Sequence, residues 1–299
     1  MPIERRLLYL KSLPLKFTKM VAAGNDFIIF NGFEYNIKDC KNLALKACDR
    51  HFGIGADGIL ICKESHRADI QMLYYNSDGS QGEMCGNGIR CFSKYAYEKG
   101  LVKNRCFTVE TLAGIKTVWL KVDENNKVKS VKVNMGKPVF NTEHIPVKLN
   151  KKNAIDEKME IDGEEIAFST VLIGVPHTVI FVDNIEDVDI NGLGTKIENH
   201  HLFPKKTNVN FVKVISREEI KVYTWERGAG RTLGCGTGAC ASVVVGNVLD
   251  KLDKRVRVKT EGGELEVIIE KRYEIFLEGE ASKVCDGVLY NIDSSIVDY

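Results

Sequence analysis

The sequence of 299 residues lacks a surplus of charge of either sign, with 42 Lys and Arg against 41 Asp and Glu. This balance gives no indication of binding to nucleic acid or to an acidic membrane surface. An apolar run at residues 7–10 is too short for a signal peptide or a membrane span, so we expect a cytoplasmic protein. A P-loop, an H-E-x-x-H motif and a G-x-S-x-G nucleophile elbow are also missing.

Cysteine pairs at the usual zinc spacing are missing too. Cys85 and Cys91 are separated by five residues, and Cys235 and Cys240 by four, whereas zinc sites ordinarily use Cys-x2-Cys. We therefore expect no metal, and in a reducing compartment the other cysteines should be thiols. We expect most of them to be buried. These other cysteines are Cys40, Cys48, Cys62, Cys106 and Cys285, with Cys91 and Cys240 packing inside helices.

What the sequence does contain is one glycine-flanked cysteine motif in two copies, 150 positions apart. The copies are Cys85-Gly86-Asn87-Gly88 and Cys235-Gly236-Thr237-Gly238. At offsets of 149 to 151 positions, Phe17 also aligns with Phe168, Gly24 with Gly174, and Gly114 with Gly263. A single doubling near domain size predicts two homologous domains. We place the first at residues 1–135, with residues 282–299 returning to it, and the second at residues 136–281.

The two halves show the same order of expected elements. In the first, strands are expected at 16–30 (broken near Gly24), 59–62 and 70–75, and a helix at 41–50. A helix after Cys85 should end at Gly100, before three strands that end near Met135. In the second, strands are expected at 166–173, 179–182, 209–214 and 220–225, and a short helix at 194–200. The helix after Cys235 is apolar on nearly every side, which predicts a central helix wrapped by sheet.

Each motif places a cysteine directly before a helix start, where N–H groups and the positive end of the helix dipole converge. Such a position suits a carboxylate, and a cysteine there should ionise more readily than free cysteine, whose pKa is about 8.5. Donors at two helix termini would stabilise the charge that develops when an α-proton leaves. A thiolate on one face and a thiol on the other would then invert the carbon. The motif pair predicts racemisation or epimerisation. A Schiff-base lysine for PLP stays open at this point.

Several segments resemble the diaminopimelate epimerase family, and the resemblance runs from about Phe17 to the last strands. They are Gly24-Asn25-Asp26-Phe27, the run from Arg50 to Gly58, Asn76-Ser77-Asp78-Gly79-Ser80, Pro176-His177, Asn208-Val209-Asn210-Phe211, Glu226-Arg227-Gly228 and both cysteine motifs. The resemblance implies a PLP-independent, metal-free isomerase with no cofactor. Its small-molecule substrate would be diaminopimelate, interconverted between the LL and meso forms for lysine and peptidoglycan synthesis.

The same resemblance implies an α/β (α+β) fold of two pseudo-symmetric domains, each a sheet or barrel curled around a central helix. It also implies a site in the cleft between them and a homodimer. By analogy Cys85 and Cys235 are the catalytic acid and base, with His177 and Glu226 in support. Arg227 would pair with the distal carboxylate. The substrate-binding residues would be Asn25, Asn76, Gly86, Asn87, Asn208, Glu226, Arg227, Gly236 and Thr237.

Two positions depart from the commonest family pattern. Val175 stands where many members have asparagine, and Arg231 stands where glutamate is frequent. One alternative is therefore a racemase or epimerase of another amino acid, such as histidine, with the same cysteine pair. Another is a fold-related isomerase or binding protein, although such relatives typically lack one or both cysteines. Without the family resemblance, His177 would be interpreted as a packing residue. Asn25, Asn76 and Asn208 lie at turns, where asparagine is common because of its backbone preferences.

Overall fold

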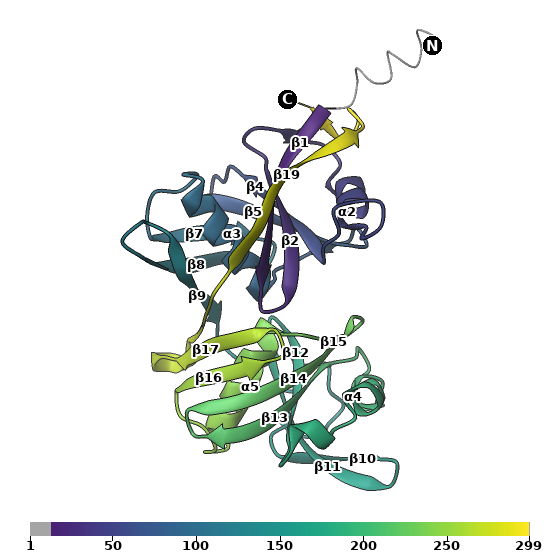
Figure 1. Cartoon of the computed structure of the whole chain (residues 1–299). Helices are drawn as coiled ribbons and strands as arrows, with labels where there is room; N and C mark the ends of the chain where they lie inside the picture. Colours follow the sequence, from purple (N-terminus) through teal and green to yellow (C-terminus); the bar gives the residue numbers. More distant parts are fainter. Residues whose placement is uncertain (1–12, 299) are drawn as a thin grey trace. The chain divides into compact units, whose positions relative to one another are not determined.

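The computed structural model describes residues 13–298, and the apolar run at residues 7–10 lies outside them. The described chain forms two compact units. Unit 1 extends to Val131 and resumes at Glu280, and unit 2 comprises Lys132–Gly279. In Figure 1 the purple strand β1 (Leu13–Ala22) lies beside the yellow strand β19 (Ser282–Ile292), so unit 1 is closed by strands from opposite ends of the described chain.

The main sheet of unit 1 has the strand order β19-β1-β2-β4-β5-β7-β8, and the short strands β3 and β20 pair separately. The pairs β2–β4 and β5–β7 are parallel, and the others are antiparallel. The strands are β2 (Asn25–Asn31), β4 (Gly58–Lys63), β5 (Ile70–Asn76), β7 (Cys106–Thr111) and β8 (Gly114–Val122), with the short strands β3 (Asn36–Ile37), β6 (Gln81–Gly82) and β20 (Val297–Asp298). The helices are α2 (Cys40–Cys48) and α3 (Gly86–Glu98). β9 (Val128–Gly136) carries the chain out of unit 1.

Unit 2 repeats this pattern with the strand order β10-β11-β12-β13-β14-β16-β17-β18, in which β12–β13 and β14–β16 are the parallel pairs. The strands are β10 (Glu157–Ile161), β11 (Glu164–Ile173), β12 (Val175–Phe181), β13 (Asn208–Ser216), β14 (Glu219–Glu226), β15 (Gly230–Thr232), β16 (Arg255–Thr260), β17 (Gly263–Ile269) and β18 (Ile275–Gly279). The helices are α4 (Ile190–Glu198) and α5 (Gly236–Val248), with 3-10 turns at Ile185–Asp187 and Lys271–Tyr273.

The two units match residue by residue at their parallel strand pairs. Phe27 lies opposite Gly58 in unit 1, and His177 lies opposite Asn208 in unit 2. Each residue of the second pair follows its counterpart by 150 positions, which is also the spacing of the two cysteine motifs. The internal duplication and the mixed α/β fold predicted from the sequence are therefore confirmed.

Each unit wraps its sheet around one helix, as the apolar pattern predicts. α3 packs against β1, β2, β4, β5 and β8, and α5 packs against β11, β12, β13, β14 and β17. Ten of the 13 residues of α5 are buried, which explains why its sequence is apolar on nearly every side. Gly100 follows α3 with a φ of +74°, a backbone conformation that glycine adopts without strain.

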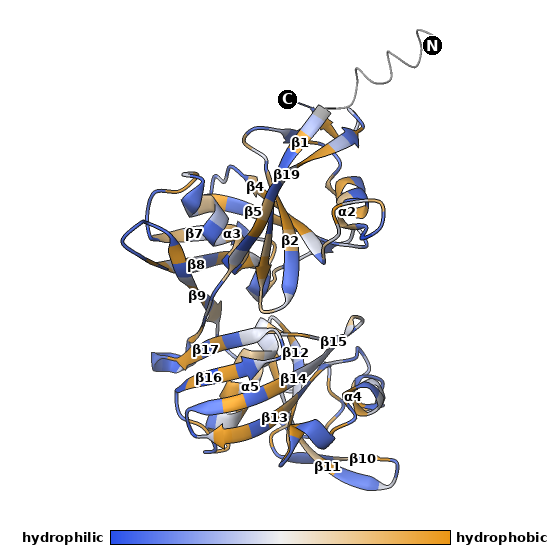
Figure 2. Ribbon diagram, viewed as in Figure 1, coloured by the Kyte–Doolittle hydropathy of each residue, from blue (hydrophilic) through white to orange (hydrophobic). Residues whose placement is uncertain are grey.

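Alternate strand residues pack against different helices. Ile28 and Ile59 join a cluster with Leu43 of α2, whereas Phe27 and Leu60 lie against Gly88 of α3. Both faces of these central strands are thus buried, which accounts for their continuous apolar runs. Nearer the unit surface, bands of orange and blue follow one another along strands such as β16 and β17 in Figure 2.

Two boundaries predicted from the sequence were wrong. The helix expected at 194–200 is α4, which begins at Ile190 because the Asp189 carboxylate accepts a hydrogen bond from the N–H of Gly192 at 3.0 Å. Two glycines in its first turns masked the helical signal. The strand expected at 179–182 is β12, which already begins at Val175, because residues 175–178 pair with β11.

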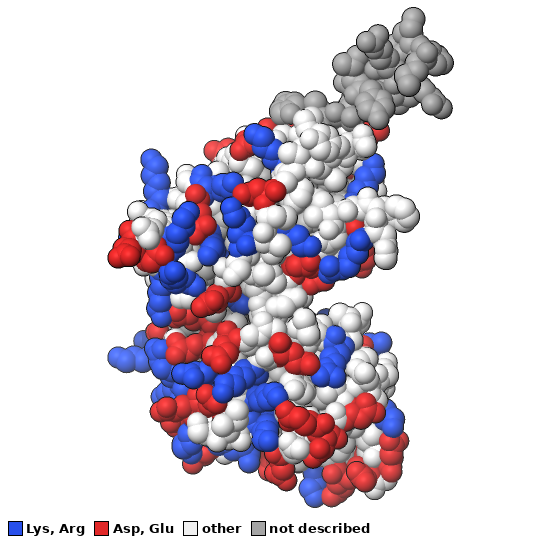
Figure 3. Space-filling model, viewed as in Figure 1, with Lys and Arg blue, Asp and Glu red and all other residues white. Residues whose placement is uncertain are grey.

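The face of the molecule shown in Figure 3 has no large area of one charge sign, because Lys and Arg are interspersed with Asp and Glu. None of the helices in the described range 13–298 has the length and apolar composition needed to cross a bilayer.

Candidate active site

The two motif cysteines occupy equivalent positions, each as the N-cap of a 13-residue helix. Cys85 caps α3 and Cys235 caps α5, both with an extended backbone. In each case the sulfur accepts the N–H of the residue three positions on, Gly88 or Gly238, at 3.4 Å. The first N–H groups of a helix lack intrahelical acceptors, so an electron-rich atom there is stabilised by the helix terminus. Both sulfurs are therefore placed where negative charge on sulfur is favoured.

Cys235 has one further contact. Its sulfur lies 3.4 Å from the hydroxyl oxygen of Thr237, and the residue is 7% exposed. Cys85 is half-buried. Both residues thus combine shielding from bulk water with donors aimed at sulfur, a combination that suits a thiol that gains and loses protons.

The other cysteines lie in different surroundings. Burial raises the pKa of Cys48 and of Cys91 to about 12, and burial also raises the pKa of Cys62, so these thiols stay protonated at neutral pH. The expectation of burial was wrong for Cys106 and Cys285, which are exposed on strands at the unit surface.

Three predicted substrate-binding residues meet at the start of α3, and we call Asn25, Cys85, Gly86 and Asn87 the unit 1 cluster. The Asn87 amide donates to the Asn25 side-chain oxygen at 2.6 Å. The buried Arg90 donates to the Asn87 side-chain oxygen and to the carbonyl of Gly86, both at 2.9 Å. Arg90 therefore fixes the first turn of the helix from inside the unit.

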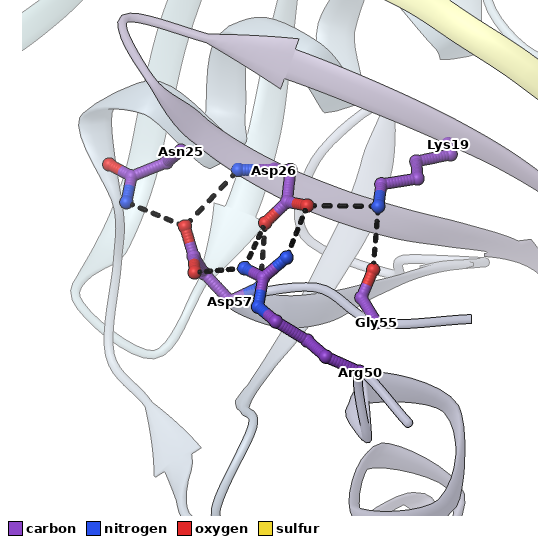
Figure 4. A network of polar contacts seen from close by, with 6 residues as sticks. All are labelled: Lys19, Asn25, Asp26, Arg50, Gly55 and Asp57. Carbon is purple, nitrogen blue, oxygen red and sulfur yellow. Dashed lines mark hydrogen bonds and ion pairs between the residues drawn. The ribbon is translucent and has the colours of Figure 1, made fainter. Parts of the chain in front are cut away.

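A network of charged side chains holds Asn25 from the other side (Figure 4). The Asn25 amide donates to Asp57 at 3.0 Å. Arg50 binds both oxygens of Asp26 at 2.9 and 3.2 Å and also reaches Asp57 at 2.8 Å. Burial raises the pKa of the Asp26 carboxyl, but hydrogen bonds from Arg50 and Lys19 outweigh burial and hold that pKa below its usual value. Asp26 therefore stays ionised, and the network fixes the turn that carries Asn25.

Asn76 lies at the end of β5, opposite Gly58 of β4. Its amide donates to the Ser80 hydroxyl at 2.9 Å, and its oxygen accepts a hydrogen bond from the Tyr74 hydroxyl. The side chain thus closes the β5–β6 turn, which is the backbone role that asparagine often has at turns.

The remaining predicted residues, apart from Asn76, all lie in unit 2, and we call His177, Asn208, Glu226, Arg227, Cys235, Gly236 and Thr237 the unit 2 cluster. Asn208 is buried, donates to the carbonyl of Pro176 at 2.8 Å and accepts the N–H of Arg227 at 2.9 Å. It therefore ties the start of β12 to the turn after β14.

The side chains of Glu226 and Arg227 differ in their hydrogen bonds within the protein. Glu226 accepts the Thr232 hydroxyl at 2.7 Å. The Arg227 side chain is exposed and donates to the carbonyl of Lys205 at 3.1 Å. A guanidinium has five N–H donors, so this contact leaves Arg227 able to bind a carboxylate in the bidentate manner.

Glu198 supports the turn that carries Arg227, although no sequence motif includes it. Its buried carboxylate accepts hydrogen bonds from the Trp225 indole at 2.7 Å and from the N–H of Gly228 at 3.2 Å, and it pairs with Lys206 at 3.3 Å. Burial raises the pKa of Glu198, but the hydrogen bonds from Trp225, Lys206 and Gly228 outweigh burial, so the pKa lies below its usual value.

Replacing Glu198 by alanine is expected to lower the free energy of unfolding by about 1–3 kcal/mol at neutral pH, because the hydrogen bonds from Trp225, Gly228 and Lys206 to a buried carboxylate are lost. A carboxyl whose folded-state pKa is lowered stabilises the protein above its unfolded-state pKa of about 4.3, and this contribution disappears as the pH falls through the folded-state pKa. Urea unfolding should therefore show a difference between Glu198→Ala and wild type that shrinks in acid. Glu186→Ala, which removes a surface ion pair with Lys221, should change stability little at any pH.

The two departures from the family pattern lie at strand positions. Val175 begins β12 and pairs with Ile173 of β11. Arg231 lies in β15, binds both oxygens of Glu261 at 2.7 and 3.1 Å, and stacks 5.3 Å from the Tyr223 ring centre. Its charge is thus matched within unit 2.

Three residues that support the site were not predicted from the sequence. Asp57 and Asn210 lie within motifs of the family resemblance and Arg90 follows the first cysteine motif, yet only the folded chain shows that each bonds a site residue. Glu198 had no sequence signal, because it comes from a helix far from any motif. Within residues 13–298, no three His, Cys, Asp or Glu side chains come together in a group that could hold a metal ion.

Both the sequence and the fold of this chain are similar to those of known proteins. The sequence profile of the family described as "Diaminopimelate epimerase" matches residues 17–141 and 169–284. A diaminopimelate epimerase of Alkaliphilus metalliredigens is 49% identical over 280 residues, covering 93% of this chain and 99% of the relative. One of Caldanaerobacter subterraneus subsp. tengcongensis is 51% identical over 273 residues, covering 91% and 98%.

The solved structures with this fold are more distant in sequence. A hydroxyproline epimerase from Agrobacterium vitis has a TM-score of 0.68 at 14% identity, covering 94% of this chain and 93% of that one. A phenazine biosynthesis protein of the PhzF family from Bacillus anthracis has a TM-score of 0.66 at 16% identity, covering 93% and 99%. These two share the fold alone. The matched profile and the sequence identities over nearly the whole length show that this chain belongs to the diaminopimelate epimerase family, whose members are isomerases.

Proposed function

We propose that the chain interconverts LL- and meso-diaminopimelate by inverting one α-carbon, with Cys85 and Cys235 as the two acid/base groups and without a cofactor. The observation that carries this proposal is the equivalence of the two cysteines. Each is the N-cap of a central helix, and each sulfur accepts one helix N–H at 3.4 Å. Equal groups at two helix starts suit a reaction that runs in both directions.

In the proposed reaction, one cysteine is a thiolate and takes the α-proton, which breaks the C–H bond and forms an S–H bond. The electron pair of the broken C–H bond delocalises into the adjacent carboxylate, where N–H donors of the two helix starts stabilise the negative charge. The other cysteine, a thiol, then donates its proton to the opposite face of the carbon. The thiol and thiolate have exchanged roles at the end, so the reverse reaction starts from the product state. This requires both sulfurs to reach one carbon.

Asn76 and the remaining residues of the two clusters would position the rest of the substrate. Arg227 is exposed and has donors to spare, so it would hold the distal carboxylate. Asn25, Asn76, Asn87 and Asn208 have their amides bonded within the chain, so their contribution would be to fix the backbone that faces the substrate. We further propose that the protein works as a homodimer, as the family resemblance implies, and that it is cytoplasmic.

The proposal is tested by incubating purified protein with LL-diaminopimelate in deuterium oxide with dithiothreitol and no added cofactor. With one acid/base group on each face of the carbon, we expect the meso product to carry solvent deuterium at the inverted carbon early in the reaction. The remaining LL substrate should acquire deuterium only later. Mass spectrometry after chiral separation measures both. Folded protein with titratable thiols that exchanges no deuterium into diaminopimelate would contradict this substrate. The same assay with other amino acids, histidine first, would then examine the change at Val175.

A further inference from the structure

The one histidine of the unit 2 cluster is held by an asparagine that the proposed reaction does not use. His177 and Asn210 are both completely buried, on neighbouring strands β12 and β13. The amide nitrogen of Asn210 lies 3.2 Å from His177 Nδ1 and 3.2 Å from the carbonyl oxygen of Thr178. The amide oxygen accepts the Thr224 hydroxyl at 3.2 Å. All three polar partners of the Asn210 amide therefore belong to unit 2.

These contacts fix which way the amide points. The Thr178 carbonyl can only accept a hydrogen bond, so the amide atom beside it must be the NH2 group. That same NH2 group faces His177 Nδ1 with its second hydrogen. Nδ1 must then be the unprotonated acceptor nitrogen, and in a neutral imidazole the proton lies on Nε2.

The charge state agrees with this reading. Burial, with a smaller contribution from the positive charge of Arg227, lowers the pKa of His177 to about 3. The ring is therefore neutral at any pH at which the protein would work. His177 Nε2 is buried and has no hydrogen-bond partner among the described residues. A buried N–H donor without a partner is uncommon, and it favours a ligand acceptor.

The duplication shows that the fold does not need a polar pair at this place. The residues of unit 1 at the same positions, 150 earlier, are Phe27 and Leu60, which are both buried. They lie against Gly88 of α3, just as the Asn210 side chain lies against Gly238 of α5. One topology thus accepts an apolar pair in one unit and a buried polar pair in the other, next to the capping cysteine Cys235. The fold itself therefore does not require a polar pair at this place.

We propose that Asn210 is a positioning residue that holds His177 as the neutral tautomer protonated on Nε2. His177 then serves the reaction as a hydrogen-bond donor to an anionic group of the bound amino acid and does not accept a proton from a thiol. This inference rests on the proposed function, because it assigns a role at the same site. It is tested separately, since the tautomer is a property of the protein in the absence of turnover.

The experiment is 15N NMR of the protein with 15N-labelled histidine, in which Asn210→Asp and His177→Gln identify the His177 signals among the six histidines. We expect a protonated Nε2 and an unprotonated Nδ1 for His177 throughout the neutral pH range. A protonated Nδ1, or an imidazolium at neutral pH, would overturn the proposal. Adding meso-diaminopimelate should shift the Nε2 and Hε2 signals. Saturating substrate that leaves both signals unmoved would overturn the donor role, whereas absence of turnover with the expected tautomer would count against the proposed reaction alone.

Variants of Asn210 separate positioning from packing. In Asn210→Asp, an ionised carboxylate beside Nδ1 can only accept, so Nδ1 is expected to become protonated, and kcat should fall about 10²–10³-fold, as for a lost preorganised donor. Thr224→Val is the matched control, because it removes the hydroxyl on the far side of the same amide and should leave the His177 tautomer unchanged. An Asn210→Asp protein that folds and keeps both the wild-type tautomer and the wild-type kcat would overturn the assignment. If that variant does not fold, the wild-type spectrum decides.

Discussion

Replacing either Cys85 or Cys235 by serine is expected to reduce kcat/KM for epimerisation by about 10²–10⁴-fold, the usual contribution of a positioned acid or base. A serine hydroxyl is far less acidic than a thiol, so it neither takes the α-proton nor is poised to return one. The fold should be unaffected, because each cysteine is an N-cap whose sulfur accepts a helix N–H, and serine is a preferred N-cap residue. Loss of activity with unchanged or slightly raised stability is therefore the expected result.

In each serine variant, the forward and the reverse reaction should be impaired to the same extent. A variant does not change the equilibrium constant between the two isomers, so kcat/KM for the forward and the reverse reactions must fall by the same factor. Chiral separation of reactions started from each isomer measures this, and urea unfolding measures stability. Cys285→Ser is the control, because Cys285 is exposed on β19 and has no place in the proposed chemistry. Wild-type rates in Cys85→Ser or Cys235→Ser would rule out the two-thiol mechanism.

Local patterns in the sequence were enough to find most strands and both central helices. The apolar helix that follows Cys235 and the closing Gly100 are readable because burial and capping act over a few residues. The start of α4 was missed for the opposite reason. Gly192 and Gly194 are poor helix formers, and the helix is made stable by the Asp189 cap and by packing of Gly194 against Trp225.

The candidate site was predictable only where it repeats. The two cysteine motifs can be recognised in the sequence because one chain carries both copies, each with glycines that let the backbone approach a ligand. The contacts of Asn210 with His177 and Thr224, and of Glu198 with Trp225 and Gly228, join residues that lie 14 to 33 positions apart. Such pairs depend on which strands become neighbours, and no local pattern encodes that. Asn208, predicted to touch the substrate, bonds two backbone groups of its own unit.

Two glycines at matching places in the motifs should respond very differently to alanine. A methyl group on Gly238 would lie 2.2 Å from the Asn210 side-chain oxygen, whereas a methyl group on Gly88 would lie 3.3 Å from Cys85 Cβ and 3.4 Å from Leu60. Asn210 can move aside only by breaking the hydrogen bonds of its amide with His177, Thr178 and Thr224. We expect Gly238→Ala to lower the free energy of unfolding by about 1–3 kcal/mol, as overpacking of a core does.

Gly88→Ala tests whether the effect comes from Asn210. Alanine is favoured over glycine inside a helix by about 1 kcal/mol, and the tight contacts with Cys85 and Leu60 offset part of that gain, so the net change at Gly88 should stay within about 1 kcal/mol. Urea unfolding of both variants gives the two values directly. Gly238→Ala should also disturb the His177 signals, since the displaced amide no longer faces Nδ1. Equal losses of stability at the two positions would show that the helix start itself, and not the buried asparagine behind α5, makes glycine necessary.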